Sequence, residues 1–212
     1  MAILPNFRDE ARRRGLLGAD EAVTLDRAYR LVRDMAFGQP SDNRPETVIA
    51  EWRGLSDTKH DVLALLLEEL GYDVAPIVAT MQHTAESASW LPPHIVDELK
   101  RAPIRDVITF LRVRTDPVAD DWTTMDATWP EGAKHFGAPA NGDFVAGVDQ
   151  RTAGVPEEIV HVQGDEDAIV VAARLLVDFA GDDIGRRMGF IDAISTFLGW
   201  ALAPVEGDTD GW

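Results

Sequence analysis

The residues with the clearest potential for chemistry are a serine and a histidine four positions apart, Ser56 and His60. Side chains at this spacing on a helix lie on one face and lean back toward the amino terminus, so the pair can be neighbours. A serine beside a histidine base is a candidate nucleophile for acyl transfer. The alternative, and the commoner case, is a structural His60 that packs beside the core or donates a hydrogen bond to a carbonyl group.

Other reactive or metal-ligating groups are sparse. The chain has no cysteine, which excludes a thiol nucleophile, thiolate ligands and disulfides. Three histidines have no partner at metal-ligand spacing: His83, His94 and His161. An acidic cluster lacks the glycine and terminal glutamate of a calcium loop: Asp116, Asp120 and Asp121. We therefore expect no metal and no cofactor.

A helix must position Ser56 and His60. Ser56 or Asp57 offers an N-cap, and Gly71 stops the helix. Leucines form its buried stripe: Leu63, Leu66, Leu67 and Leu70. Segments rich in β-branched and aromatic residues then predict strands: 74–78, Val107–Arg114 and Trp122–Asp126. A helix followed by successive antiparallel strands predicts an α+β fold.

Additional helices are expected at both ends of the chain. Apolar residues recur at helical spacing between Asn6 and Gly38 and predict two amphipathic helices that act as a lid or brace. Pro45 can begin a short helix over Glu46–Trp52. Toward the carboxyl end we expect a long loop, a strand and two helices: Gly132–Val155, Ile159–Val162, Glu166–Ala180 and Ile184–Leu202.

Three segments resemble the core of the transglutaminase-like superfamily in order and spacing. They are RGLSDTKHDVLALLLEELGYDVAPIVA from Arg53, VITFLRVR from Val107, and DDWTTMDATW ending at Trp129. The resemblance covers about residues 45–130 and depends on the pairing of T-K-H with the later W-x-x-x-D-A-T-W. It implies a papain-like core in which one central helix packs on an antiparallel sheet. The family's nucleophilic cysteine begins that helix, a histidine lies on the next strand, and an aspartate on the following strand orients the histidine.

The chain departs from this pattern at two of the three positions. Ser56 stands at the cysteine position and Ile108 at the histidine position, whereas Asp126 is retained. A serine needs a positioned base, and isoleucine cannot supply one. The resemblance therefore implies a catalytically degenerate member. Without a histidine to orient, we expect Asp126 to cap a turn or to pair with Arg112 or Arg114.

Three functions remain open. We expect a degenerate protein that uses the retained cleft to bind a peptide, a small acyl ligand or a partner protein. The second is an amide hydrolase or amide-forming enzyme with Ser56 as nucleophile and His60 or His135 as base. The third is an accessory or structural protein whose cleft is filled by side chains, with Ile108 contributing.

The candidate binding residues are mainly aromatic. Tryptophans concentrate in the segment that carries the resemblance, where packing is their commoner role. Trp90 lies beside two prolines and is the one that we would place at a groove edge. The full set of candidate binding residues is Trp52, Trp90, Trp129 and His135.

Length, charge and hydropathy bear on the domain organisation, the partners and the location of the protein. We interpret the 212 residues as one domain with N-terminal helices (1–44), the recognisable core (45–130), an excursion (131–163) and C-terminal helices (164–204). A net charge of −17 disfavours nucleic acid. The apolar stretch Met188–Val205 contains Asp192, which favours a buried helix over a membrane span. The first residues do not resemble a secretory signal, so we expect a cytoplasmic protein.

Overall fold

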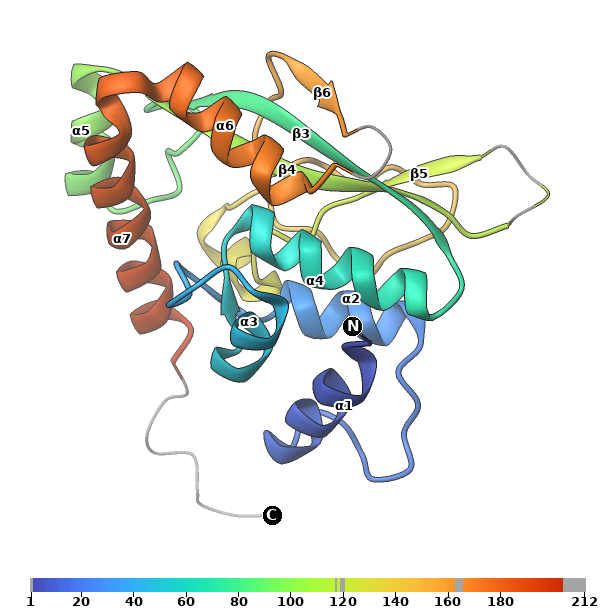
Figure 1. The fold of residues 1–212 in the computed structure, drawn as a ribbon. Helices are drawn as coiled ribbons and strands as arrows, with labels where there is room; N and C mark the ends of the chain where they lie inside the picture. Colours follow the sequence, from blue (N-terminus) through green and yellow to red (C-terminus); the bar gives the residue numbers. More distant parts are fainter. Residues whose placement is uncertain (1, 117, 119–120, 163–165, 204–212) are drawn as a thin grey trace, which may run out of the picture.

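The computed structural model describes residues 2–116, 118, 121–162 and 166–203, and the fold is α+β (Figure 1). Within these residues an antiparallel sheet has the strand order β5-β4-β3-β6. Its strands are β3 (Asp73–His83), β4 (Ile104–Arg114), β5 (Trp122–Met125) and β6 (Ile159–His161). A small parallel pair joins β1 (Ala36–Phe37) to β2 (Arg53–Gly54). The α+β prediction is confirmed.

Helices surround this sheet, and local sequence explains where several of them begin. The α-helices are α1 (Leu4–Arg13), α2 (Leu25–Arg33), α3 (Pro45–Glu51), α4 (Ser56–Glu69), α5 (Pro93–Arg101), α6 (Ala168–Ala180) and α7 (Ile184–Ala201). Short 3₁₀ turns are η1 (Glu131–Phe136) and η2 (Gly181–Asp183). The Thr24 hydroxyl caps α2 and the Asp167 carboxylate caps α6, while prolines occupy the first turns of α1, α3 and α5.

The two long strands determine which side chains share a face. β3 and β4 pair along their whole length, from Asp73 opposite Arg114 to His83 opposite Ile104. Successive side chains on a strand point to opposite faces. Val78 and Val107 therefore pack against α6 on one face, where Leu111, Val113 and Met125 join the core around α4. Ile77, Ala79 and Met81 face the other side.

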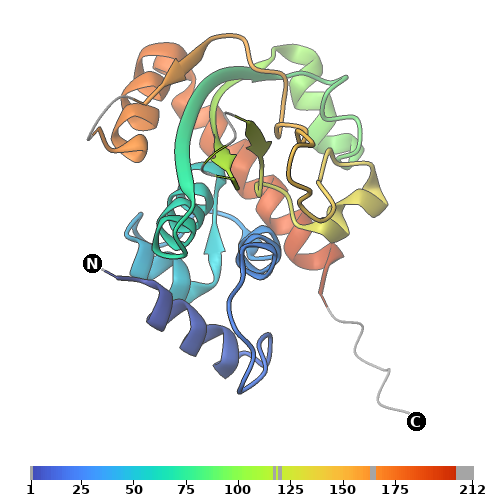
Figure 2. The same cartoon turned by 90° about the vertical axis from the view of Figure 1, so that its right-hand side faces the viewer.

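The central helix α4 lies on the first of these faces. Its buried leucines pack with α1, α2 and α3, so the N-terminal helices brace α4 from outside. Figure 2 shows α4 nearly end-on, with η1 and the following loop on the other side of the strands. The expected arrangement of one central helix on an antiparallel sheet is confirmed.

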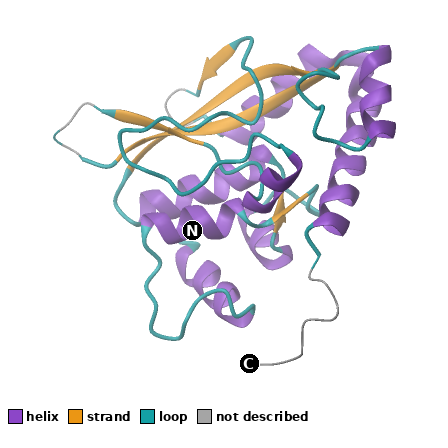
Figure 3. Cartoon of the chain, turned by 180° about the vertical axis from the view of Figure 1, so that it is seen from behind, coloured by secondary structure: helices purple, strands orange, loops and turns teal. Residues whose placement is uncertain are grey.

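The opposite face is covered by two helices and a long loop. The buried residues Phe190 and Ile194 of α7 and Ile95 of α5 pack against this face near the end of β3. The loop between η1 and β6 crosses the same side, which faces the viewer in Figure 3. A ligand approaching this face of the sheet therefore meets both helical and loop residues.

The sequence predictions hold for most elements but miss α5, the short strands β1 and β2, and the 3₁₀ turn η1. Helix α5 was not expected, although Ile95 and Leu99 have helical spacing. Helix α7 buries only one side: Met188 and Trp200 are 59% and 79% exposed, so the expectation of a buried helix holds for one face and not for the other. Among the described residues, no helix has the length and apolar character needed to cross a membrane. Asp120 and Val205 lie outside the described residues.

Candidate functional site

Ser56 is the first residue of α4, and its hydroxyl contacts the sheet. The Oγ atom accepts a hydrogen bond from the Thr109 N–H at 2.8 Å and donates to the Thr109 carbonyl at 3.3 Å. The side chain is only 8% exposed. Both functions of the hydroxyl are therefore engaged with the backbone of β4, and its proton points to a carbonyl oxygen.

His60 is fully buried one turn later, and backbone groups occupy both of its ring nitrogens. Nδ1 donates to the Ser56 carbonyl at 2.6 Å, and Nε2 accepts the Ala127 N–H at 2.8 Å. This pairing assigns the proton to Nδ1. Burial lowers the pKa of His60, so the ring is neutral. The structural interpretation, donation to a carbonyl, is confirmed, and the structure does not place His60 as a base on Ser56 Oγ.

Asp126, which the sequence resemblance places at the position of a catalytic aspartate, also binds backbone groups. Oδ1 accepts the Thr128 N–H at 2.8 Å and Oδ2 accepts the Ala153 N–H at 2.7 Å. The expected turn cap is confirmed, while Arg112 and Arg114 have other partners. Because Ala153 belongs to the long loop, Asp126 fixes this loop against the end of β5.

Lys59 lies beside these groups and has no exposed surface. Its ammonium donates to the carbonyls of Arg33 at 2.8 Å and Thr128 at 3.1 Å. Burial lowers the pKa of Lys59 to about 7. The side chain holds α2 and the segment after β5 against α4, and its enclosure keeps it from any ligand.

The space that a reacting group would need above Ser56 is almost closed. A cavity of about 20 Å³ remains there, lined among others by Ser56, Ile108 and Ile191. This volume accommodates about one water molecule. Ile108 supplies an apolar surface where the resemblance implies a histidine, and α7 brings Ile191 onto it. This leaves little room for a substrate carbonyl beside the Ser56 hydroxyl.

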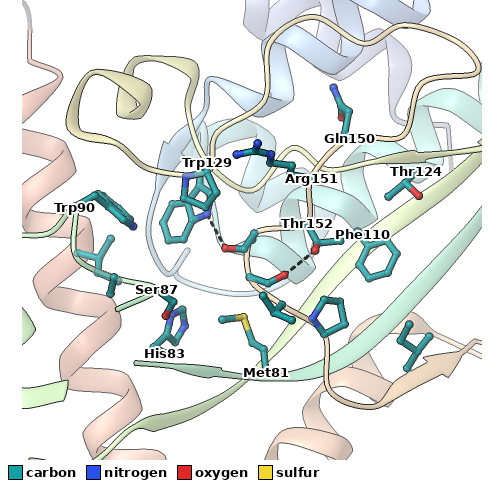
Figure 4. A pocket seen from close by; sticks show the side chains of 18 of the residues that line it. Met81, His83, Ser87, Trp90, Phe110, Thr124, Trp129, Gln150, Arg151 and Thr152 are labelled. Atoms are coloured by element: carbon teal, nitrogen blue, oxygen red, sulfur yellow. Dashed lines mark hydrogen bonds between the residues drawn. The ribbon is translucent and has the colours of Figure 1, made fainter. Parts of the chain in front are cut away.

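A much larger pocket opens next to this closed space (Figure 4). Its volume is about 630 Å³, and it lies between the sheet, α7 and the long loop. The apolar wall includes Met81, Trp90, Leu91, Phe110, Trp129, Phe190 and Ile194. The polar residues that line it are His83, Ser87, Arg112, Thr124, Asp149, Gln150, Arg151 and Thr152. An apolar pocket of this size with a few polar groups is typical of small-molecule sites.

A buried charge cluster borders the closed cavity and reaches this pocket through His83. The Asp106 carboxylate accepts from His83 Nε2 at 3.0 Å and from Arg187 Nε at 2.5 Å. Burial opposes ionisation of Asp106, yet the hydrogen bond from His83 and the charge of Arg187 hold its pKa below the ordinary value. His83 lines both spaces, and its Nδ1 has no hydrogen-bond partner among the described residues.

Sequence reasoning missed this cluster, because its three residues come from β3, β4 and α7. The signal was the strand register: Met81 lies opposite Asp106, so His83 is a diagonal neighbour of Asp106 on the same face. That register cannot be read from spacing along the chain.

The geometry of the site is the basis for inferring a function. No family model, no curated protein and no solved structure matches the chain. Within the described part of the chain, no group of three or more histidine and acidic side chains is placed to hold a metal ion. The arrangement offers an apolar pocket with polar edges rather than an assembled nucleophile and base.

The predicted binding residues divide into two groups. Trp90 and Trp129 line the pocket, with ring centroids 5.3 Å apart in an edge-to-face arrangement. Trp52 instead stacks on Phe7 at 5.3 Å within the N-terminal core. His135 is exposed on η1 and is not among the residues that line the pocket.

Proposed function

We propose that this protein is a degenerate relative of the transglutaminase-like enzymes that binds a small, largely apolar acyl ligand without performing acyl transfer. The ligand occupies the pocket of about 630 Å³, which adjoins the small cavity at Ser56. The proposal combines the sequence resemblance with the geometry beside Ser56.

The observation that carries the proposal is the contrast between two adjoining spaces. The space at Ser56 has about 20 Å³, and the neighbouring pocket has about 630 Å³. The two share His83, Trp129 and Ala153 in their walls. A filled reaction position beside an open apolar pocket supports binding as the retained activity.

The enzymatic alternative has less support from the same contacts. Ser56 Oγ hydrogen-bonds Thr109, and both ring nitrogens of His60 hydrogen-bond backbone groups. His135 lies on the exposed surface of η1. The third alternative, a purely structural protein, accounts for the closed space but leaves the larger pocket without a role.

Fluorescence titration with a neutral apolar fluorophore, N-phenylnaphthylamine, tests binding. We expect saturable binding at one site, with the affinity reduced about three- to tenfold in Trp90→Ala, because the aromatic contact with the ligand is lost. Trp200→Ala is the matched control, because Trp200 is 79% exposed and does not line the pocket. Thermal melting of both variants verifies that each is folded.

Absence of saturable binding to the folded native chain would rule out the proposed function. Equal losses of affinity in Trp90→Ala and Trp200→Ala would show that the probe binds elsewhere on the surface.

A further inference from the structure

The charge of the pocket opposes the charge of the chain. The whole sequence has 37 acidic and 20 basic residues, giving a net charge of −17. The pocket instead has two arginines in its lining, Arg112 and Arg151, against one acidic residue, Asp149. An anion that the rest of the surface repels therefore meets a locally cationic wall.

The single acidic side chain is already engaged. Asp149 Oδ1 accepts the Thr124 N–H at 2.6 Å. This backbone hydrogen bond, with a smaller contribution from the charge of Arg112, holds the pKa of Asp149 below its ordinary value. Asp149 therefore stays ionised and fixes β5 to the loop, and in the described part of the chain it makes no ion pair with Arg151.

Arg151 is exposed, and its guanidinium is available to a ligand. Its backbone N–H and C=O both bond to Asn141, but its guanidinium makes no hydrogen bond or ion pair with any residue that the structure describes. Elsewhere in this acidic chain many arginines do have carboxylate partners, as Arg114 has Asp73 and Arg187 has Asp106. In Figure 4 the Arg151 side chain lies at the edge of the pocket and extends toward Trp129.

Arg112 supplies a second set of donors. One terminal nitrogen donates to the Trp122 carbonyl at 2.5 Å, whereas its buried Nε has no hydrogen-bond partner among the described residues. Buried donors without partners are rare in folded proteins and call for an acceptor. The available polar capacity of the pocket thus consists chiefly of guanidinium donors, which match a carboxylate in geometry and charge.

The pocket also continues along the sheet. A second hollow of about 490 Å³ shares Phe110, Arg112 and Ile159 with the first. The shared residues place the two hollows side by side, with Arg112 where they meet. Ile77 and Trp122 extend the apolar wall of the second hollow. This shape suits an elongated apolar chain better than a compact ring.

We infer that the ligand is an acyl carboxylate, an extended hydrocarbon chain whose carboxylate binds Arg151, with the positive charge of Arg112 adding to the attraction. The chain lies against Phe110 and the tryptophans of the pocket. This inference rests on the proposed function and adds the charge of the ligand and the residues that recognise it.

A matched pair of fluorescent ligands tests the inference: a dansylated undecanoic acid and its primary amide. We expect the native chain to bind the acid about tenfold or more tightly than the amide, as for a charge-assisted hydrogen bond to guanidinium. In Arg151→Gln this preference should fall severalfold with the affinity for the amide unchanged. Arg151→Lys should retain part of the preference for the acid. Arg174 is an exposed arginine outside the pocket lining, so Arg174→Gln should leave this preference unchanged.

The two proposals fail in different ways. Equal binding of acid and amide to the native chain would overturn the carboxylate inference while leaving the proposed function in place. No binding of either ligand, together with no binding of the neutral fluorophore, would overturn both. An acid preference that survives in Arg151→Gln would overturn the assignment to Arg151.

Discussion

Polar side chains around the start of α4 bind backbone groups instead of one another. Ser56 bonds Thr109, His60 bonds Ser56 and Ala127, and Lys59 bonds carbonyl groups from two segments. Each of these side chains satisfies a buried N–H or C=O that would otherwise have no partner. Serine, histidine and lysine side chains, which often act in catalysis, here fix α4 to neighbouring backbone segments.

Ser56 should be unreactive. Fluorophosphonate and activated acyl probes are expected to leave the mass of the folded chain unchanged at this residue, because its hydroxyl has no base and the space above it is about 20 Å³. Intact-protein mass spectrometry of the native chain and Ser56→Ala measures this. An adduct on the native chain that disappears in Ser56→Ala would establish a live nucleophile and refute the binding account.

Sequence predicted most of the elements, because their signals are local. The leucine stripe of α4 and the β-branched runs of β3 and β4 appear as periodic patterns, and the structure has all three elements, although β3 extends to His83, beyond the expected 74–78. Helix α5 was missed because its signal is short: Ile95 and Leu99 after two prolines. The exposed side of α7 was missed because its mixed apolar pattern does not distinguish one buried side from two.

The site was less predictable than the elements. The spacing of Ser56 and His60 correctly placed them one turn apart, but it did not reveal that the ring would bond to the Ser56 carbonyl rather than the hydroxyl. The pocket depends on a loop without periodicity and on contacts between β3, β4 and α7. Contacts of that kind depend on strand register and helix docking, which spacing within one segment does not encode.

At the scale of one element, α4 has an unfavourable carboxylate. Burial, with repulsion from Asp167, Asp57 and Glu68, raises the pKa of Asp61 to about 7. Between about pH 4 and pH 7 the folded state therefore binds more protons at Asp61 than the unfolded state does. The contribution of Asp61 to the free energy of unfolding consequently falls as the pH rises through this range.

Asp61→Asn should therefore stabilise the protein above pH 7. The gain in the free energy of unfolding at pH 8 is expected to be a few kcal/mol, since each unit of pKa shift corresponds to about 1.4 kcal/mol, and it should shrink toward pH 4. Urea unfolding across this pH range measures the gain. Asp192→Asn, an exposed aspartate on α7, is the matched control. A gain that does not change with pH would contradict the assigned ionisation.

The whole molecule carries an excess of negative charge that no single contact offsets. Surface ion pairs such as Arg44 with Asp42 and Lys100 with Asp97 are present, but exposed pairs of this kind contribute about 0–1 kcal/mol each. The net charge of −17 remains after all pairs form. Added salt weakens both the attraction within ion pairs and the repulsion among the excess negative charges. Because acidic residues outnumber basic ones, the loss of repulsion is expected to be the larger effect.

Because repulsion between like charges exceeds the gain from ion pairs, the free energy of unfolding should rise with salt. We expect the increase between about 0.05 and 0.5 M sodium chloride, where the screening length falls well below the size of the domain. Urea is the suitable denaturant, because guanidinium is itself a salt. Reversing several exposed acidic residues outside the pocket to lysine should flatten the salt response if net charge is its cause. A fall in stability with added salt would instead show that the ion pairs dominate, and the acidic surface would then be organised into stabilising networks rather than uncompensated charge.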